Sequence, residues 1–189
     1  MHIIYKNKFL YFHNYKIKCS IGKRGLTKKK VEGDGCTPKG KFNFEYLLYR
    51  KDKIKKVDTN LRKRPINRSM GWCDDPNSNK YNKLVNFPFS GGAEKLYLKS
   101  SNYNLILIIK YNRNPVVKNK GSAIFLHLTN KKHRPTLGCI AIKKNKGSAI
   151  FLHIATKNFN PTKGCLAIRK RDLLKILPLI NKKTKICIN

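Results

Sequence analysis

The feature that most constrains this chain is a tandem repeat close to its C-terminal end. Residues 119–144, NKGSAIFLHLTNKKHRPTLGCIAIKK, return as residues 145–170, NKGSAIFLHIATKNFNPTKGCLAIRK, and 17 of the 26 positions are identical. In each copy an apolar run of strand type ends at a histidine, and a cysteine follows a Pro-Thr-x-Gly turn. A thiol and an imidazole at the two ends of a predicted hairpin are the parts of a cysteine nucleophile and its base. The two pairs are His127 with Cys139 and His153 with Cys165.

The charge of the chain is strongly positive, with 43 basic against 9 acidic residues and a formal net charge of +34. Such a balance predicts attraction to anionic polymers. The basic residues are mostly lysine, however, and they are spread from Lys6 to Lys185 instead of forming one face or tail. Specific recognition of phosphates and bases relies more on arginine, whose planar fork binds in a bidentate manner. Together with many Asn and Ile residues, the lysines favour an AT-rich coding sequence as the cause, and we expect no specific nucleic-acid partner.

Length and cysteine content predict one domain, residues 1–189, that folds without a disulfide framework. A chain of 189 residues is long enough to bury a core of its own. Its six cysteines are scattered and no CxxC occurs, so a structural zinc site lacks its usual spacing. No apolar run reaches the length of a membrane span or of a signal-peptide core. On these grounds alone we expect a soluble, unexported protein.

Hydrophobic patterning predicts a mostly β fold with one or two short helices, and the number of strands favours a closed sheet or sandwich. Leucine and isoleucine at helical spacing predict a helix over residues 172–180, and residues 95–99 are a weaker strand candidate. Residues 51–92 are polar and are expected to be irregular. The predicted strands cover residues 2–6, 8–13, 15–21, 41–49, 105–111 and 184–188, together with 148–153 and 165–168 in the second repeat.

The repeated unit supplies the groups needed for acyl transfer. If its two strands are adjacent and antiparallel, His153 and Cys165 lie opposite each other, with Cα atoms about 4.5–5.5 Å apart. A neighbouring imidazolium lowers the pKa of a thiol and so favours the nucleophilic thiolate. Gly164 allows a close approach of the backbone to a substrate, so the amides of Gly164 and Cys165 are candidates for an oxyanion hole. Pro161 and Thr162 are expected to make the turn rigid.

Other interpretations of these residues remain open. A lone buried cysteine is usually an inert small hydrophobe, and a histidine at the end of a strand is usually a packing residue. A zinc site is a further alternative, although the usual paired spacing of ligands is absent. Its ligands would come from His127, His133, Cys139, His153 and Cys165.

Several motifs together resemble the L,D-transpeptidase catalytic domain, the YkuD-like family. The string GSAIFLHIATKNFNPTKGCLAI is similar to the family's active-site segment, in which a histidine and a loop precede Ser/Thr-x-Gly-Cys. Gly33-Asp34-Gly35, followed by Thr37-Pro38-x-Gly40-x-Phe42, resembles the family's GDG and TPxGxF stretch. The segments 70–75, 81–82 and 90–98 resemble one branch of the family. The likeness extends from about Cys19 to the C-terminus.

This resemblance implies a YkuD-like β-sandwich that acts on peptidoglycan stem peptides and needs no cofactor or metal. The family's cysteine attacks the carbonyl of the third-position diamino acid, releases D-Ala, and passes the acyl group to an amine to form a 3-3 cross-link. Carried over by position, Cys165 is the nucleophile and His153 the base, and the amides of Gly164 and Cys165 form the oxyanion hole. The GDG and TPxGxF residues are implied to be structural turns. Implied substrate contacts are Trp72, Tyr81 and Thr162.

The sequence departs from the family pattern around the nucleophile. Many members have Ser-His-Gly-Cys and an arginine soon afterwards, whereas residues 162–168 here are Thr-Lys-Gly-Cys-Leu-Ala-Ile. An arginine or lysine elsewhere must therefore hold the substrate carboxylate.

The loop between the histidine and the cysteine distinguishes the two repeats as candidates for the active site. The second copy has Ala155 and Phe159, as the family branch tends to have, and so we favour His153 with Cys165. The alternative copy offers His127, Gly138 and Cys139, and a hybrid site that pairs the histidine of one copy with the cysteine of the other is less favoured.

Three functions are compatible with the sequence. The first is a peptidoglycan L,D-transpeptidase, and the second is an L,D-carboxypeptidase that hydrolyses the same bond. The third is a catalytically inactive basic protein that binds anionic wall polymer or nucleic acid. The chemistry of the first two predicts a location in the cell envelope or periplasm, although no signal peptide is visible in the sequence.

Overall fold

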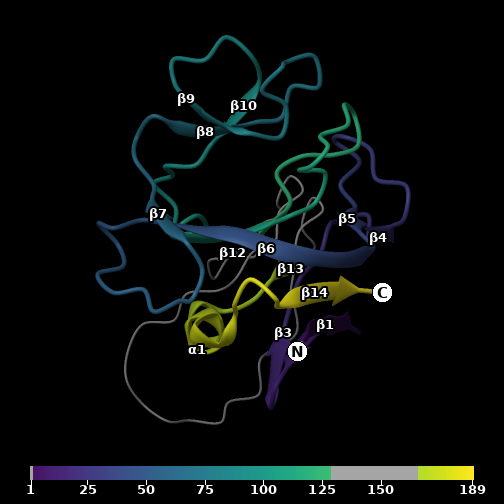
Figure 1. Cartoon of the computed structure of the whole chain (residues 1–189), viewed down its shortest axis with the longest axis vertical. Helices are drawn as coiled ribbons and strands as arrows, with labels where there is room; N and C mark the ends of the chain where they lie inside the picture. The colour runs from purple at the N-terminus through teal and green to yellow at the C-terminus, as the bar shows by residue number, and fades with distance from the viewer. Residues whose placement is uncertain (1, 129–165) are drawn as a thin grey trace.

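The computed structural model describes residues 2–128 and 166–189, and they form a curled β-structure with one short α-helix (Figure 1). The strands are β1 (His2–Lys6), β2 (Phe9–Phe12), β3 (Tyr15–Lys18), β4 (Leu26–Thr27), β5 (Thr37–Pro38), β6 (Gly40–Tyr49), β7 (Lys63–Pro65), β8 (Met70–Cys73), β9 (Leu84–Asn86), β10 (Ala93–Lys95), β11 (Leu105–Ile109), β12 (Phe125–His127), β13 (Leu166–Ala167) and β14 (Lys185–Ile188). The helices are α1 (Lys170–Ile176) and a 3-10 turn, η1 (Leu177–Leu179).

Strand β6 is the longest described strand, and it joins the parts of the main sheet. The order of that mixed sheet is β13-β12-β11-β6-β14-β1-β2-β3, and β7 pairs with β6 outside this path. One edge of β6 pairs with β11, while β14 and β7 share the other edge at successive positions. The alternation of aromatic and apolar residues along residues 40–49 suits a strand that has neighbours on both sides.

The two ends of the chain lie side by side within the sheet. Strand β1 pairs in parallel with β14, and Ile3 faces Ile186 in that register. Both side chains are fully buried. Because β14 also pairs with β6, the N-terminal meander of β1, β2 and β3 is attached to the rest of the sheet through the C-terminal strand.

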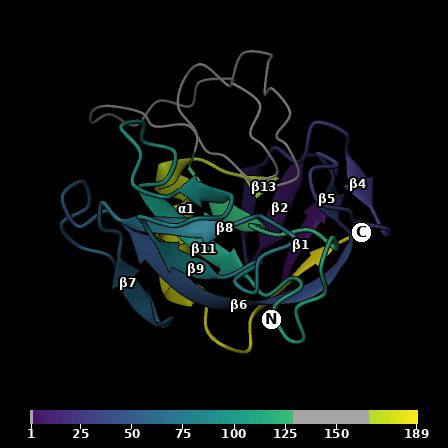
Figure 2. The ribbon, with the colours of Figure 1, turned by 90° about the horizontal axis from the view of Figure 1, so that it is seen from above.

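A second, three-stranded sheet with the order β10-β8-β9 lies over one face of the main sheet, and α1 lies on the opposite face (Figures 1 and 2). Every residue of β8 is buried, including Trp72. The indole of Trp72 meets the ring of Phe125 on β12 edge to face, with ring centroids 5.0 Å apart. This contact links the small sheet to the strand that carries His127.

Helix α1 packs its apolar side into the core through Leu173 and Ile176. Asp172 lies in its first turn and Lys175 in its last, which is the favourable orientation with respect to the helix dipole. Pro178 lies inside η1, where it cannot continue an α-helix. The described chain contains no helix with the length and apolar character required to span a membrane.

The predicted fold class is confirmed: the structure is mostly β, with a curled mixed sheet consistent with a YkuD-like β-sandwich and a single short α-helix. The helix begins at Lys170, two residues before the predicted start. The prediction that residues 51–92 are irregular was wrong for three short strands, β7, β8 and β9. The strand predicted over residues 95–99 was also wrong, because β10 ends at Lys95. The strand of residues 148–153 lies outside the described residues.

Because β14 pairs with a neighbouring strand on both of its edges, a cavity at Ile186 should strongly lower the stability of the fold. We expect Ile186→Ala to lower the free energy of unfolding by about 2–5 kcal/mol, because the site is fully buried between β1 and β6. Ile4→Ala is the matched control on the neighbouring strand. Its side chain is 42% exposed, and its loss should cost less than about 1 kcal/mol. Urea unfolding of both variants measures the difference, and equal costs would contradict the assignment of the core.

Candidate active site

Strand β12 ends on His127, and strand register fixes which side chains share its face of the sheet. His127 lies opposite Ile106 of β11, and Ile106 lies opposite Leu48 of β6. Leu48 is in turn paired with Arg64 of β7, and His127 with Ala167 of β13. Directly paired residues lie on the same face of a sheet. A single row of side chains therefore crosses four strands, from Arg64 of β7 to His127 of β12.

The imidazole of His127 is held in a defined orientation inside the protein. The side chain is fully buried, and its ring meets Tyr103 edge to face at a centroid distance of 5.0 Å. The hydroxyl of Tyr103 donates to Oε1 of Glu94 at 2.5 Å. This hydrogen bond holds the Tyr103 ring in place against the imidazole of His127. Packing and hydrogen bonding together thus restrict the rotation of the histidine.

The protonation of the ring follows from its contact with the backbone. Nδ1 of His127 lies 2.7 Å from the carbonyl oxygen of Leu128. Because a carbonyl oxygen can only accept, Nδ1 must carry the hydrogen of this bond. In the neutral imidazole Nε2 is then the basic nitrogen.

The strand that follows Cys165 lies next to the strand of His127. Leu126 pairs with Leu166 and His127 with Ala167, and the two strands are parallel. The prediction of an antiparallel pair concerned His153 and Cys165 within the second copy, and that pair lies outside the described residues. The other predicted site residues that also lie outside them are Cys139, Gly138, Thr162 and Gly164. Of the five residues named as alternative zinc ligands, only His127 is described.

Trp72 and Tyr81, predicted as substrate contacts, are both buried. Nε1 of Trp72 donates to Oδ1 of Asn82 at 3.0 Å, and the guanidinium of Arg113 lies 4.8 Å from the centre of the indole. The hydroxyl of Tyr81 donates to Oε2 of Glu32 at 2.5 Å. Burial and this hydrogen bond raise the pKa of Tyr81, so the phenol stays protonated. Both side chains have structural partners, and their contact with a substrate stays a prediction.

Asn82 is a hydrogen-bonding centre that the sequence analysis missed. Besides Trp72, its Oδ1 accepts the amide of Ala123 at 3.2 Å, in the segment that leads into β12. Its Nδ2 donates to the carbonyls of Tyr111 and Asn112. Residues 81–82 belong to a segment that resembles the family, but the local sequence does not predict these hydrogen bonds, because all of the partners are ten or more positions away. Its position in the left-handed region, at φ 55°, is the only local property that favours asparagine.

The GDG motif forms a turn, as predicted, whereas the turn predicted for the TPxGxF motif was wrong: Thr37–Pro38 form β5 and Gly40 begins β6. Both glycines of the first motif have positive φ, and the carboxylate of Asp34 between them accepts the amides of Val31 and Cys36. The same carboxylate receives Nζ of the buried Lys30 at 2.6 Å. In the second motif, a Cβ at Gly40 would come within 2.7 Å of the Phe42 ring.

The pKa of Asp34 reflects two opposing influences. Partial burial by itself raises the pKa, while the hydrogen bond from Lys30 and those from the two amides lower it. The hydrogen bonds prevail, and the pKa of Asp34 lies below its ordinary value. Asp34 therefore stabilises the folded state in its ionised form.

Fold and site together define a β-rich domain with a buried, oriented histidine at the end of β12. The family model of the L,D-transpeptidase catalytic domain matches residues 3–146, which is more than half of the chain. The chain belongs to the YkuD family of L,D-transpeptidase catalytic domains. Comparisons with curated proteins and with solved structures found no match. The matched range contains His127 and Cys139 and ends before His153 and Cys165.

Removing the Asn82 side chain should destabilise the whole site. We expect Asn82→Ala to cost about 2–4 kcal/mol, because it leaves the indole of Trp72 and the Ala123 amide without their acceptor and places alanine at positive φ. Asn86→Ala, at an exposed position on β9, should change stability by less than about 0.5 kcal/mol. Thermal and urea unfolding measure the stability of the two variants. Equal losses of stability would contradict the inference that Asn82 is a structural centre.

Asp34 should make stability depend on pH at the acidic end of the range. Its contribution is complete above the unfolded pKa, near 3.8, and is lost as the pH falls through the lower folded pKa. At pH 7 we expect Asp34→Asn to cost about 2 kcal/mol, since a charge-assisted hydrogen bond to buried Lys30 is lost. The stabilities of the two proteins should converge below pH 4. A difference that stays constant down to pH 2.5 would show that ionisation of Asp34 is not the cause.

Proposed function

We propose that this protein is a peptidoglycan L,D-transpeptidase whose nucleophile is Cys165. Membership of the YkuD family supports a cysteine acyltransferase that acts on stem peptides. The observation that carries the assignment of residues is the strand register: β13, which begins one residue after Cys165, pairs with the strand that ends on His127. This register favours His127, with its basic Nε2, as the partner of Cys165.

The proposed reaction has two steps and returns the enzyme to its starting state. The Cys165 thiolate attacks the carbonyl carbon of the third-position diamino acid, and a C–S bond forms. The C–N bond to the terminal D-Ala breaks, and the imidazolium gives its proton to the leaving amine. The amine of an acceptor stem then attacks the thioester, a C–N bond forms, and the C–S bond breaks. The imidazole accepts the proton of the amine, and the thiolate is restored.

The amides of Gly164 and Cys165 are proposed to stabilise the negative charge on the carbonyl oxygen in both steps. No cofactor or metal takes part in this scheme. Because the substrate lies in the cell wall, we also propose a location in the cell envelope. Detection of the native protein only in a cytosolic fraction would contradict that location.

The sequence predicted His153 as the base. The pairing of β12 with β13 favours His127 instead. Cys139 is the alternative nucleophile, because the family model covers it together with His127. Substitution of each histidine, with the modified cysteine mapped directly, separates these possibilities.

The first experiment is reaction of the purified full chain with a carbapenem, followed by intact-mass analysis and peptide mapping. Carbapenems acylate the activated cysteine of this family. We expect an adduct on Cys165 in the wild type, retained in His153→Gln and slowed at least about 100-fold in His127→Gln. Near-UV circular dichroism establishes that both variants are folded.

Each other result assigns a different site. Label on Cys139 would move the nucleophile to the first copy, and loss of reaction in His153→Gln alone would place the base in the second copy. No adduct on any cysteine would contradict the transpeptidase proposal and favour a basic binding protein. Product analysis with a stem tetrapeptide and an acceptor amine separates a 3-3 cross-link from the hydrolysed tripeptide that a carboxypeptidase would release.

A further inference from the structure

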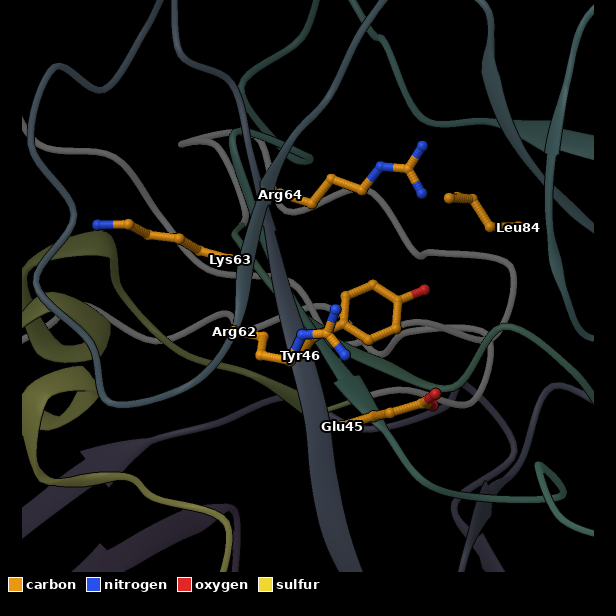
Figure 3. A pocket seen from close by; sticks show the side chains of 6 residues that line it. All are labelled: Glu45, Tyr46, Arg62, Lys63, Arg64 and Leu84. Carbon is orange, nitrogen blue, oxygen red and sulfur yellow. The ribbon is translucent and has the colours of Figure 1, made fainter.

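A cavity of about 460 Å³ lies beside β6 and β7, and the sequence motifs do not include any of its residues. Figure 3 shows its walls, with the Arg64 guanidinium directed toward Leu84 and the hydroxyl of Tyr46 directed to the same side. Lys63 extends away on the other side of the strand (Figure 3). The lining residues are Glu45, Tyr46, Arg62, Lys63, Arg64 and Leu84.

A β-bulge builds the floor of this cavity. Leu107 pairs with Leu47 and Ile109 with Phe44, so Glu45 and Tyr46 together oppose one residue of β11. A bulge of this kind turns two consecutive side chains toward one face. That face is the one occupied by Leu48, because Leu47 and Phe44 both point the other way. The bulge thus brings a phenol and a carboxylate together at the base of one cavity.

Arg64 of β7 and Arg62, which immediately precedes this strand, form one wall of the cavity. Arg64 pairs with Leu48 and so lies on the same face as the bulge. Arg62 precedes it by two residues, which places it on that face as well. Its carbonyl accepts the amide of Leu47, so the pairing with β6 continues to this position. The two guanidiniums therefore lie on the same side of the sheet as Tyr46.

The charges at the cavity are unbalanced in favour of an anion. Glu45 is already engaged, since its two oxygens accept Nε and Nη2 of Arg113 at 2.9 and 3.2 Å. Among residues 2–128 and 166–189, no carboxylate forms an ion pair with Arg62 or Arg64. Burial raises the pKa of Tyr46, which keeps its hydroxyl available as a donor. Within the described part of the chain, the exposed guanidinium groups of Arg62 and Arg64 and the phenol of Tyr46 thus line a concave site whose carboxylate, Glu45, is already paired with Arg113.

We infer that this cavity is a substrate subsite in which Arg62 and Arg64 bind a carboxylate of the peptidoglycan stem peptide. The inference rests on the proposed function, which supplies a substrate that carries several carboxylates. Guanidinium groups match carboxylate geometry in a bidentate manner. The half-buried Leu84 and the ring of Tyr46 add apolar walls suited to the carbon skeleton of a peptide.

The position of the subsite indicates which part of the substrate it holds. Arg64 and His127 belong to one cross-strand row and are separated by three strand spacings, or about 14 Å between Cα atoms. That distance is about the span of four extended residues. The subsite therefore holds a carboxylate remote from the bond that reacts, and its loss should weaken binding of the stem.

Isothermal titration calorimetry of the full chain tests the subsite independently of catalysis. The probes are a synthetic stem tetrapeptide and the same peptide with its carboxylates amidated, at about 150 mM salt to screen the general positive charge. We expect Arg62→Gln and Arg64→Gln each to weaken binding of the free-carboxylate peptide about tenfold. Neither variant should alter binding of the amidated peptide. Arg68→Gln, an exposed arginine outside the cavity, is the matched control and should change neither affinity.

The possible results separate this inference from the proposed function. Equal affinities in wild type, Arg64→Gln and Arg68→Gln would overturn the subsite, even if the carbapenem labels Cys165. Arginine-dependent binding of inorganic phosphate that matches or exceeds binding of the peptide would also overturn it, because the site would then be one for phosphate. Arginine-dependent binding of the peptide in a protein that no carbapenem labels would support the subsite and contradict the transpeptidase.

Discussion

The pairing of β6 along both of its edges is the interaction on which the rest of the structure depends. Its first residues hydrogen-bond to β14 and, through β14, retain the N-terminal meander. Its later residues hold β11 on one side and β7 on the other. The bulge at Glu45 and Tyr46 is a local break in this pairing, and it turns two polar side chains to the face where His127 lies. Strand β6 thus holds the parts of the main sheet together and also places two polar side chains on the face of the sheet that carries His127.

The orientation of His127 depends on the same frame. Its position is fixed by pairing with Ile106, and its ring by Tyr103. The bond from Nδ1 to the Leu128 carbonyl then selects the tautomer with a basic Nε2. Because the carbonyl belongs to the next residue of the chain, this choice requires no additional side chain. The backbone next to a buried histidine thus selects which ring nitrogen carries the hydrogen.

Local patterns predicted the parts of this fold that local interactions determine. The alternation in residues 2–6 and 41–49, the apolar run at 105–109 and the helical spacing after Lys170 each indicated the element found there. Strand β8 was missed because MGWC is short, contains glycine and lies in a polar region, although all four residues are buried. The centre at Asn82 and the row from Arg64 to His127 were missed for another reason. They arise from contacts between distant segments, which a single sequence does not display.

The sheet also constrains what a duplicated active-site segment can do. Strand β12 has two edges, and β11 occupies one of them. The other edge pairs with Leu166 and Ala167, which follow the cysteine of the second copy. A strand edge accepts one neighbour at a given position, because each backbone amide and carbonyl is used once in the ladder. The second edge of β12 thus has room for one neighbouring strand, and Leu166 and Ala167 occupy it beside His127.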